Sequence, residues 1–220
     1  MQFINKVFNT PTLEQRFIEK ASIPSDINQH IPTLFRHALE CNHITECGVR
    51  SVVSSYAFAF ALKTKNTNKL VQVDLDWHPN LDVFKTECAK EGVNVVFYKQ
   101  SDLECPIEKT DLLFIDTWHI YGHLKRELER WNSHVGKYII LHDTTVDEWE
   151  GESVRMQMNI DEQIKSSGYP REEITKGLWP AVEEFLQSHS EWTIKERYTH
   201  NNGLTILSKN PDVITMKYVF

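Results

Sequence analysis

The chain has 220 residues, 40% hydrophobic and 25% charged, the composition of a globular protein with one full core. Its formal net charge is −7, from 24 basic and 31 acidic residues, which disfavours a nucleic-acid backbone as the main partner. No apolar run approaches the roughly 18–20 residues that cross a bilayer, so no membrane partner is expected.

The first residues and the cysteines bear on where the protein works. The sequence MQFINKVFNTPTLEQRF lacks the apolar stretch of a signal peptide. No two of the cysteines have the CxxC spacing of common zinc and redox motifs; they are Cys41, Cys47, Cys88 and Cys105. We therefore expect reduced, mostly buried thiols in a cytoplasmic protein.

Short apolar strands alternate with helical segments along most of the chain. Continuous apolar strands separated by helices predict a parallel sheet covered on both faces, a Rossmann-like α/β fold. In chain order we expect a helix at His30–Glu40, a strand at Ile44–Gly48, a helix at Ser54–Lys65, a strand at Lys69–Leu75, a helix at Asn80–Glu91, strands at Asn94–Tyr98 and Asp111–Asp116, an amphipathic helix through Leu124, Leu128 and Trp131, and a strand at Lys137–His142.

The last third of the sequence has a different character. Residues 146–177 are polar and predict a long loop or lid with a short helix, followed by a helix at Leu178–Gln187. Two further strands, Trp192–Tyr198 and Leu204–Ser208, flank an Asn-Gly pair. Asn-Gly between strand-like runs is a strong hairpin signal, because both residues accept positive φ. The parallel sheet should therefore end in an antiparallel β-hairpin.

We expect residues 1–220 to form a single domain, since no repeat or Pro/Gly-rich linker divides the sequence. Residues 1–40 lie outside the core pattern and are interpreted as an N-terminal helical arm, which could mediate a homodimer. Residues 146–177 are interpreted as an inserted lid.

Acidic or polar side chains follow four of the expected strands. Ligands of open parallel sheets bind at the carboxyl ends of the strands, so these positions point to a ligand site. An Asp after a strand is also a common helix N-cap, which is the alternative for each position taken singly. The residues are Glu46 with Gly48, Asp74, Ser101 with Asp102, and Asp116.

This order of motifs resembles the class I S-adenosylmethionine (SAM)-dependent methyltransferases. The stretches LFIDTWHIYGHLKRELERW and YIILHDT are similar to a small-molecule branch whose motifs read F-I-D-x-x-H-x-Y…D/E-L…W and I-x-x-H-D-T. The resemblance covers roughly residues 44–208 and is most specific at residues 112–144. It implies a SAM-binding enzyme with a Rossmann-like sheet.

The resemblance also implies roles for the residues at the strand ends. Asp74 would accept hydrogen bonds from both ribose hydroxyls, as two adjacent donors suit one carboxylate. Ser101 and Asp102 would lie beside the adenine. Gly48 would let the backbone approach the methionine part of the cofactor. The remaining cofactor-binding positions are Glu46, which would orient the loop, and Asp116.

The loop after the first strand departs from the family pattern. The family usually has E-x-G-x-G-x-G or E-x-G-x-x-x-G, whereas Arg50 and Val52 occupy the later glycine positions here. A β-branched residue is sterically awkward where a backbone approaches a ligand. Either the loop takes another path, or hydroxyls such as that of Ser54 contact the cofactor carboxylate.

A second group of candidate residues lies in the D-x-x-H and H-D-T motifs. Methyl transfer from a sulfonium requires mainly that the acceptor be aligned and deprotonated. His119 is our candidate general base, supported by His142 and Asp143. Asp116 and Asp143 could alternatively hold Mg²⁺ or another divalent cation, although Thr144 stands where relatives often have a second carboxylate or amide.

The sequence thus predicts a SAM-dependent O-methyltransferase acting on a small hydroxylated acceptor. The resemblance favours a sugar or nucleotide-sugar, although the acidity of residues 147–152 disfavours a strongly anionic acceptor on that side. Two alternatives stay open. One is a metal-dependent hydrolase or oxygenase built on Asp116, His119, His142 and Asp143. The other is a nucleotide-binding domain without catalytic activity, which the missing glycines would explain.

Overall fold

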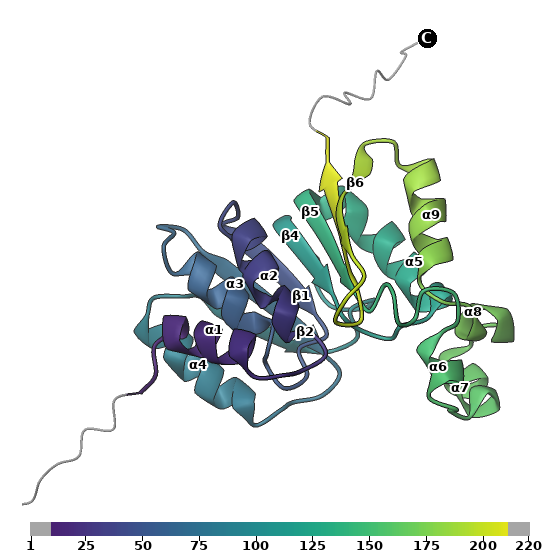
Figure 1. Ribbon diagram of the computed structural model, residues 1–220, viewed down its shortest axis with the longest axis horizontal. Helices are drawn as coiled ribbons and strands as arrows, with labels where there is room; N and C mark the ends of the chain where they lie inside the picture. The colour runs from purple at the N-terminus through teal and green to yellow at the C-terminus, as the bar shows by residue number, and fades with distance from the viewer. Residues whose placement is uncertain (1–9, 211–220) are drawn as a thin grey trace, which may run out of the picture.

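A seven-stranded sheet with helices on both faces organises the protein (Figure 1). The structure is a computed structural model, and it describes residues 10–210. The strands are β1 (His43–Cys47), β2 (Lys69–Asp74), β3 (Val95–Lys99), β4 (Thr110–Ile115), β5 (Val135–His142), β6 (Trp192–Tyr198) and β7 (Leu204–Lys209).

The order of strands across the sheet is β3-β2-β1-β4-β5-β7-β6. Strands β1 to β5 pair in parallel, and β7 is antiparallel to both of its neighbours. The turn between β6 and β7 places Asn201 and Asn202 at φ 48° and 66°, the conformation that Asn tolerates best after Gly. The predicted Rossmann-like sheet with a terminal antiparallel hairpin is confirmed.

Helices connect the strands and cover both faces of the sheet. Two short 3₁₀ turns, Asn28–His30 and Asn132–His134, precede α2 and β5. The helices are α1 (Leu13–Ser22), α2 (Ile31–Ala38), α3 (Ser55–Leu62), α4 (Asn80–Lys90), α5 (Tyr121–Trp131), α6 (Glu152–Arg155), α7 (Ile160–Ser167), α8 (Arg171–Thr175) and α9 (Trp179–Ser188).

The central strands supply alternate side chains to two separate cores. In β4, Leu112 and Phe114 pack into the core beneath α1 to α4, whereas Leu113 and Ile115 pack into the core beneath α5 and α9. This alternation follows from the two-residue period of a strand. It explains why β4 is apolar at four consecutive positions, Leu112–Ile115.

The N-terminal helices are part of the first core and do not form a separate arm. Leu13, Ile31 and Leu34 are fully buried, and α1 and α2 pack against α3. These helices therefore contribute to the first core and do not lie outside it, although Ile18 on α1 remains 55% exposed. Residues 1–9 lie outside the described part of the chain, and the homodimer stays a prediction.

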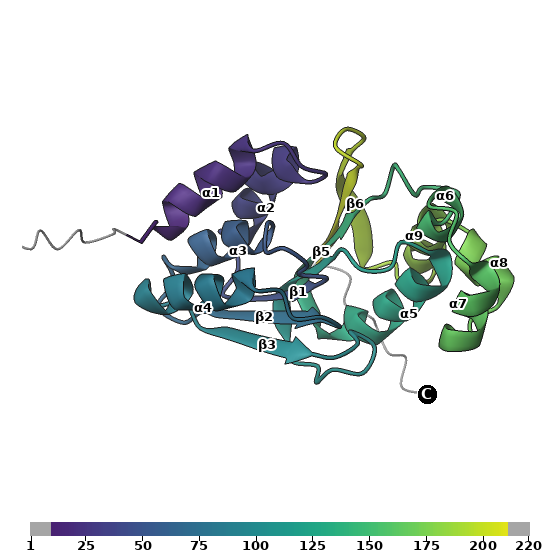
Figure 2. The same cartoon turned by 90° about the horizontal axis from the view of Figure 1, so that it is seen from below.

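Residues 146–177 contain three short helices, α6 to α8, where the sequence predicted one. They lie together beside α5, next to the carboxyl ends of β4 and β5 (Figures 1 and 2). Ile174 is fully buried, and a Cβ at Gly177 would lie 2.5 Å from the Asp147 carbonyl oxygen. This segment is therefore closely packed against its own loop. Among the described residues, no helix combines the length and apolarity needed to cross a bilayer.

Candidate functional site

A cavity of about 340 Å³ lies at the carboxyl ends of the first four strands. The chain reverses its direction of progress across the sheet between β1 and β4, and ligands of such sheets bind at this switch point. The structure thus brings together strand-end residues that are far apart in the sequence. The lining residues are Gly48, Arg50, Val73, Asp74, Leu75, Gln100, Ser101, Asp102, Asp116, Thr117, Trp118 and His123.

Gly48 lies where the loop after β1 passes the end of β4. Its φ is +84°, and a Cβ at this position would lie 1.9 Å from the carbonyl oxygen of Asp116. Both the conformation and the close approach exclude a larger residue. Gly48 therefore allows the first and fourth strand ends to meet at the wall of the cavity.

The loop keeps left-handed backbone conformations at the positions where the family pattern has glycine. Arg50 has φ 47° and Val52 has φ 66°. Such values are unusual for an L-residue, and a β-branched side chain is a clear outlier. Of the two explanations offered for the missing glycines, the structure therefore favours neither: the backbone adopts the glycine-like conformation without glycine.

Asp74 at the end of β2 holds this loop. Its Oδ2 accepts hydrogen bonds from the backbone N–H groups of Val49 and Arg50, each at 2.8 Å, and its Oδ1 accepts one from Asp76 at 3.0 Å. Because a carboxylate offers about four lone-pair sites, Asp74 can still accept a hydrogen bond from a ligand in the cavity.

Glu46 and Ser54 face each other in the protein interior and do not line the cavity. Glu46 is fully buried and accepts hydrogen bonds from Ser54, Ser55 and Gln72. Burial raises the pKa of Glu46 to about 7, although these hydrogen bonds oppose the shift. Neither side chain faces the cavity, because the alternation of β1 turns Glu46 toward α3, and the assignment of both residues to the cofactor stays a prediction.

Ser101 and Asp102 follow β3 and form the opposite wall. The Oδ1 of Asp102 lies 3.3 Å from His123 Nε2. Burial disfavours ionisation of Asp102, but the hydrogen bond with His123 and its charge outweigh burial and lower the pKa of Asp102 to about 2. The cavity therefore has one carboxylate on each side, Asp74 and Asp102.

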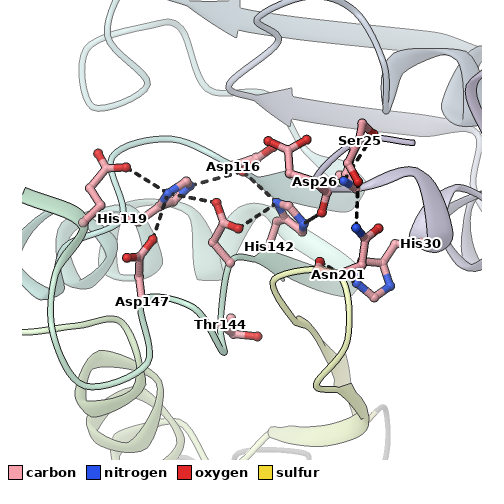
Figure 3. Close-up of polar contacts among 12 residues, drawn as sticks. Ser25, Asp26, His30, Asp116, His119, His142, Thr144, Asp147 and Asn201 are labelled. Carbon is pink, nitrogen blue, oxygen red and sulfur yellow. Dashed lines mark hydrogen bonds and ion pairs between the residues drawn. The ribbon is translucent and has the colours of Figure 1, made fainter. Parts of the chain in front are cut away.

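Next to the cavity, two histidines converge on Asp116 (Figure 3). Its Oδ1 lies 3.2 Å from His119 Nε2 and 3.1 Å from His142 Nδ1. The other nitrogen of His142, Nε2, lies 3.2 Å from the backbone oxygen of Asp26. Burial opposes protonation of His142, but the carboxylate of Asp116 raises its pKa to about 9. The D-x-x-H and H-D-T motifs thus form one cluster.

His119 is surrounded by carboxylates. Its Nε2 faces Asp116. Its Nδ1 lies 3.0 Å from Asp143 Oδ2, 3.1 Å from Glu152 Oε2 and 3.5 Å from Asp147 Oδ2. Burial opposes a charge on His119, yet hydrogen bonds to these carboxylates hold its pKa well above the usual value. These carboxylates favour the protonated imidazole, which must lose its proton before it can act as a base, and the assignment of His119 as the general base stays a prediction.

The ends of β4 and β5 could hold a cation. Asp116, His142 and Asp143 offer ligand atoms that all lie within 4.8 Å of one another. Oδ1 of Asp143 is buried and has no hydrogen-bond partner among the described residues, which fits a position left for a metal. Thr144 does not belong to the set, because its hydroxyl pairs with that of Thr205 at 2.9 Å.

Sequence reasoning missed several residues of these clusters. In the sequence, Asp147 and Glu152 are only part of an acidic stretch, because their approach to His119 depends on the path of residues 146–177. His123 and Glu127 lie one turn apart on α5, a spacing that the sequence shows and that could have drawn attention to them.

A strand order of β3-β2-β1-β4-β5-β7-β6, with a cavity at the switch point, is the fold of the class I SAM-dependent methyltransferases. Solved structures described as methyltransferases share this fold. No family model matches the sequence, and no curated protein matches it.

Three of the similar structures are described as O-methyltransferases. A putative O-methyltransferase from Klebsiella pneumoniae is 16% identical, with a TM-score of 0.55, covering 93% of this chain and 92% of the other. A putative caffeoyl-CoA O-methyltransferase from Staphylococcus aureus is 15% identical, with a TM-score of 0.56 and coverage of 90% and 92%. The O-methyltransferase TomG from Streptomyces achromogenes, involved in tomaymycin synthesis and solved with SAM, is 13% identical, with a TM-score of 0.55 and coverage of 89% of each chain.

Proposed function

We propose that the protein is a SAM-dependent methyltransferase that methylates a hydroxyl oxygen of a small acceptor. The observation that carries this proposal is the cavity at the switch point, where Gly48, Asp74, Asp102 and Asp116 arrive from four different strand ends. The similar structures described as O-methyltransferases support the same reaction class.

The two carboxylates on opposite walls suit the two polar ends of an adenosine. Asp74 would accept hydrogen bonds from the ribose hydroxyls, and Asp102, with Ser101 beside it, from the adenine amino group. Gly48 and Asp116 line the same cavity, so the methionine part would lie along the backbone at Gly48, with its amino group near Asp116. When bound, SAM supplies a methyl group already activated on a sulfonium.

The acidic cluster would hold a divalent cation through Asp116, His142 and Asp143. This set combines two carboxylates and an imidazole, which suits a first-row divalent metal, and Oδ1 of Asp143, which accepts no hydrogen bond among the described residues and lies 3.6 Å from His142 Nδ1, could serve as a ligand atom. When bound, the cation lowers the pKa of an acceptor hydroxyl. In this arrangement Asp143 and Asp116 would hold the cation beside the acceptor, and a protonated His119 would balance the charge of the surrounding carboxylates.

The charges around the cluster do not separate the two acceptors that the sequence suggested, a sugar and a nucleotide-sugar. Asp26, Asp116 and Glu152 are partly exposed next to it, but protonated His119 and His142 and a bound cation would offset their negative charge. We propose a small polyhydroxylated acceptor of one of these two kinds.

Calorimetric titration with SAM and S-adenosylhomocysteine (SAH) tests the proposed cofactor. We expect both to bind, and Asp74→Ala to weaken binding by about 1–3 kcal/mol, because a ligand hydroxyl then lacks its acceptor. Asp76→Ala is the matched control, since Asp76 is exposed and contributes only a backbone N–H to this region.

Two results would redirect the interpretation. If neither compound binds at millimolar concentration while a divalent metal binds to the cluster, the metal-dependent hydrolase or oxygenase becomes the better reading. Binding of SAH without methyl transfer to any hydroxylated acceptor in a panel, with or without Mg²⁺ or Mn²⁺, would instead point to a nucleotide-binding domain without catalytic activity.

A further inference from the structure

Residues on one face of α5 contact Asp102. His123 contacts its carboxylate, and the side chains of Arg130 and Trp131 donate hydrogen bonds to its backbone oxygen at 3.2 and 3.3 Å. Together with Glu127, these residues stand at helical positions that share one side of α5. The helix therefore fixes both the backbone and the side chain of Asp102 at the cavity wall.

The carboxyl groups of Asp102 and Glu127 leave two oxygens without a hydrogen-bond partner among the described residues, Oδ2 of Asp102 and Oε2 of Glu127. Both residues are buried, with exposed fractions of 7% and 1%. Their ligand atoms lie with that of His123 in one group, all within 4.8 Å of one another. Two buried carboxylates so close together cannot both be ionised at low cost.

A single proton satisfies both orphaned oxygens. Protonated Glu127 has a hydroxyl that can donate to Asp102, while its other oxygen still accepts the hydrogen bond from Thr117 at 2.7 Å. The charges fit this location of the proton. Burial and the neighbouring carboxylate raise the pKa of Glu127 well above its usual range, whereas His123 helps to keep Asp102 ionised.

We infer that Glu127 is a carboxylic acid that donates a hydrogen bond to Asp102 and fixes it as a carboxylate that only accepts. This inference rests on the proposed function, in which Asp102 faces the purine. Glu127 is then a positioning residue. It makes the cavity select a purine whose 6-amino group donates a hydrogen bond to Asp102. A purine with an oxo group at position 6 presents an acceptor to the carboxylate of Asp102, which is also an acceptor, so no hydrogen bond forms and this purine binds more weakly.

Binding of two ligands that differ only at this position tests the selectivity. We would titrate wild type, Glu127→Gln and Glu127→Leu with SAH and with S-inosylhomocysteine, its 6-oxo analogue. Wild type should prefer SAH by roughly tenfold or more. Glu127→Leu should lose most of its SAH affinity but little of its weaker affinity for the analogue, so that the preference collapses. Glu127→Gln, which keeps a donor for Asp102, should restore the preference.

Glu87→Leu is the control for removing a buried acid. Glu87 is equally buried on α4, but it pairs with Arg16 and Tyr56 away from the cavity. This variant should unfold more readily and keep the ratio of the two affinities. Equal weakening of both ligands by Glu127→Leu, or no weakening of either, would overturn the selective role of Glu127.

The location of the proton can be measured without any ligand. The infrared spectrum of the protein at pH 7 should contain a carbonyl band of a protonated carboxyl group that Glu127→Gln removes. An unchanged spectrum would overturn the inference, as would stoichiometric Zn²⁺ binding that Glu127→Gln and His123→Ala abolish, since the oxygens would then be metal ligands. If wild type binds neither homocysteine compound, the proposed function fails, and the infrared result still decides where the proton lies.

Discussion

At the scale of single residues, Arg50 and Val52 show how a loop can keep the path of a glycine-rich loop without glycine. Left-handed conformations cost L-residues roughly 1–2 kcal/mol each, so a contact must hold them. The backbone hydrogen bonds that Asp74 accepts from Val49 and Arg50 supply one such contact. In addition, Val52 is fully buried in the first core.

Arg50→Gly should stabilise the protein, because glycine adopts this conformation without steric strain. The Arg50 side chain is 86% exposed, so its removal forfeits little packing. After subtraction of the extra chain entropy of glycine, we expect a gain of about 0.5–1 kcal/mol in the free energy of unfolding by urea. Arg50→Ala loses the same ion pair with Asp26 and retains the strained Cβ, so its stability should not rise; if Arg50→Ala gained as much, the strain would be refuted.

The carboxylates around Asp143 make a second residue-scale prediction. Without a cation, Asp143→Asn should lower the melting temperature, because it removes a carboxylate that lies 3.0 Å from His119 and 3.6 Å from His142, both held protonated by this cluster. Added Mn²⁺ should stabilise wild type by an amount that grows with its concentration, reaching about 2.7 kcal/mol at a hundred times the dissociation constant. It should stabilise Asp143→Asn far less.

Asp82→Asn is the control for the metal experiment, as Asp82 is an exposed acid on α4. It should respond to Mn²⁺ as wild type does. A wild-type melting temperature that no divalent cation shifts would contradict the metal site, and an equal shift in all three proteins would mean that the ion binds elsewhere.

At the scale of elements, β6 joins the N-terminal helices to the rest of the fold. Glu196 accepts hydrogen bonds from both terminal nitrogens of Arg36 on α2, at 3.0 and 2.6 Å, and lies 3.4 Å from His37. The hydrogen bond from Arg36 is the main cause that lowers the pKa of Glu196 to about 2. Thus α2, which the sequence placed outside the core, is tied to the last hairpin.

Glu196→Gln should therefore destabilise the protein in a pH-dependent way. A carboxyl group whose pKa is lowered by folding contributes stability above its unfolded pKa, and loses it as the pH falls through the folded value. Above pH 4.5, the free energy of unfolding by urea should be about 0.5–1 kcal/mol higher for wild type than for Glu196→Gln. The difference is small because Arg36 is half exposed and solvent partly screens the pair. The difference should shrink as the pH falls toward 2 and vanish below it. The exposed Glu129→Gln should show no such gap, and a gap that widened toward low pH would exclude this ion pair as its cause.

The pattern of residues could not predict the short helices α7 and α8. Residues 160–175 are polar, and isolated helices of 5 to 8 residues are marginal in water. Their stability comes from contacts such as that of buried Ile174, which depend on where the loop packs. The parallel strands, by contrast, were predictable because each contains a short run made mostly of apolar residues between helical segments.

At the scale of the whole molecule, the sheet decides which parts of the site the sequence could reveal. Carboxyl ends of parallel strands meet at one edge, so Asp74, Asp102 and Asp116 could be placed together from the sequence alone. The direction of each side chain could not. Glu46 stands one residue before the end of β1 and turns into the core, and the nearby Ser54 follows it there.

The ionisation states were also beyond the sequence. His119 fits a general base by its type and its motif, yet three of its four carboxylate neighbours lie on β5 or beyond it in the chain. Only the folded arrangement shows that they crowd one imidazole. The same holds for the pair of Asp102 and Glu127, whose contact depends on α5 packing beside β3 and β4.

A crystal structure of the protein with SAH tests most directly whether the strand ends bind one adenosyl ligand. We expect the adenosine in the cavity between Asp74 and Asp102, with the ribose hydroxyls on Asp74 and the 6-amino group on Asp102. An adenosine bound at any other surface, with this cavity filled only by water at saturating SAH, would contradict the proposed site.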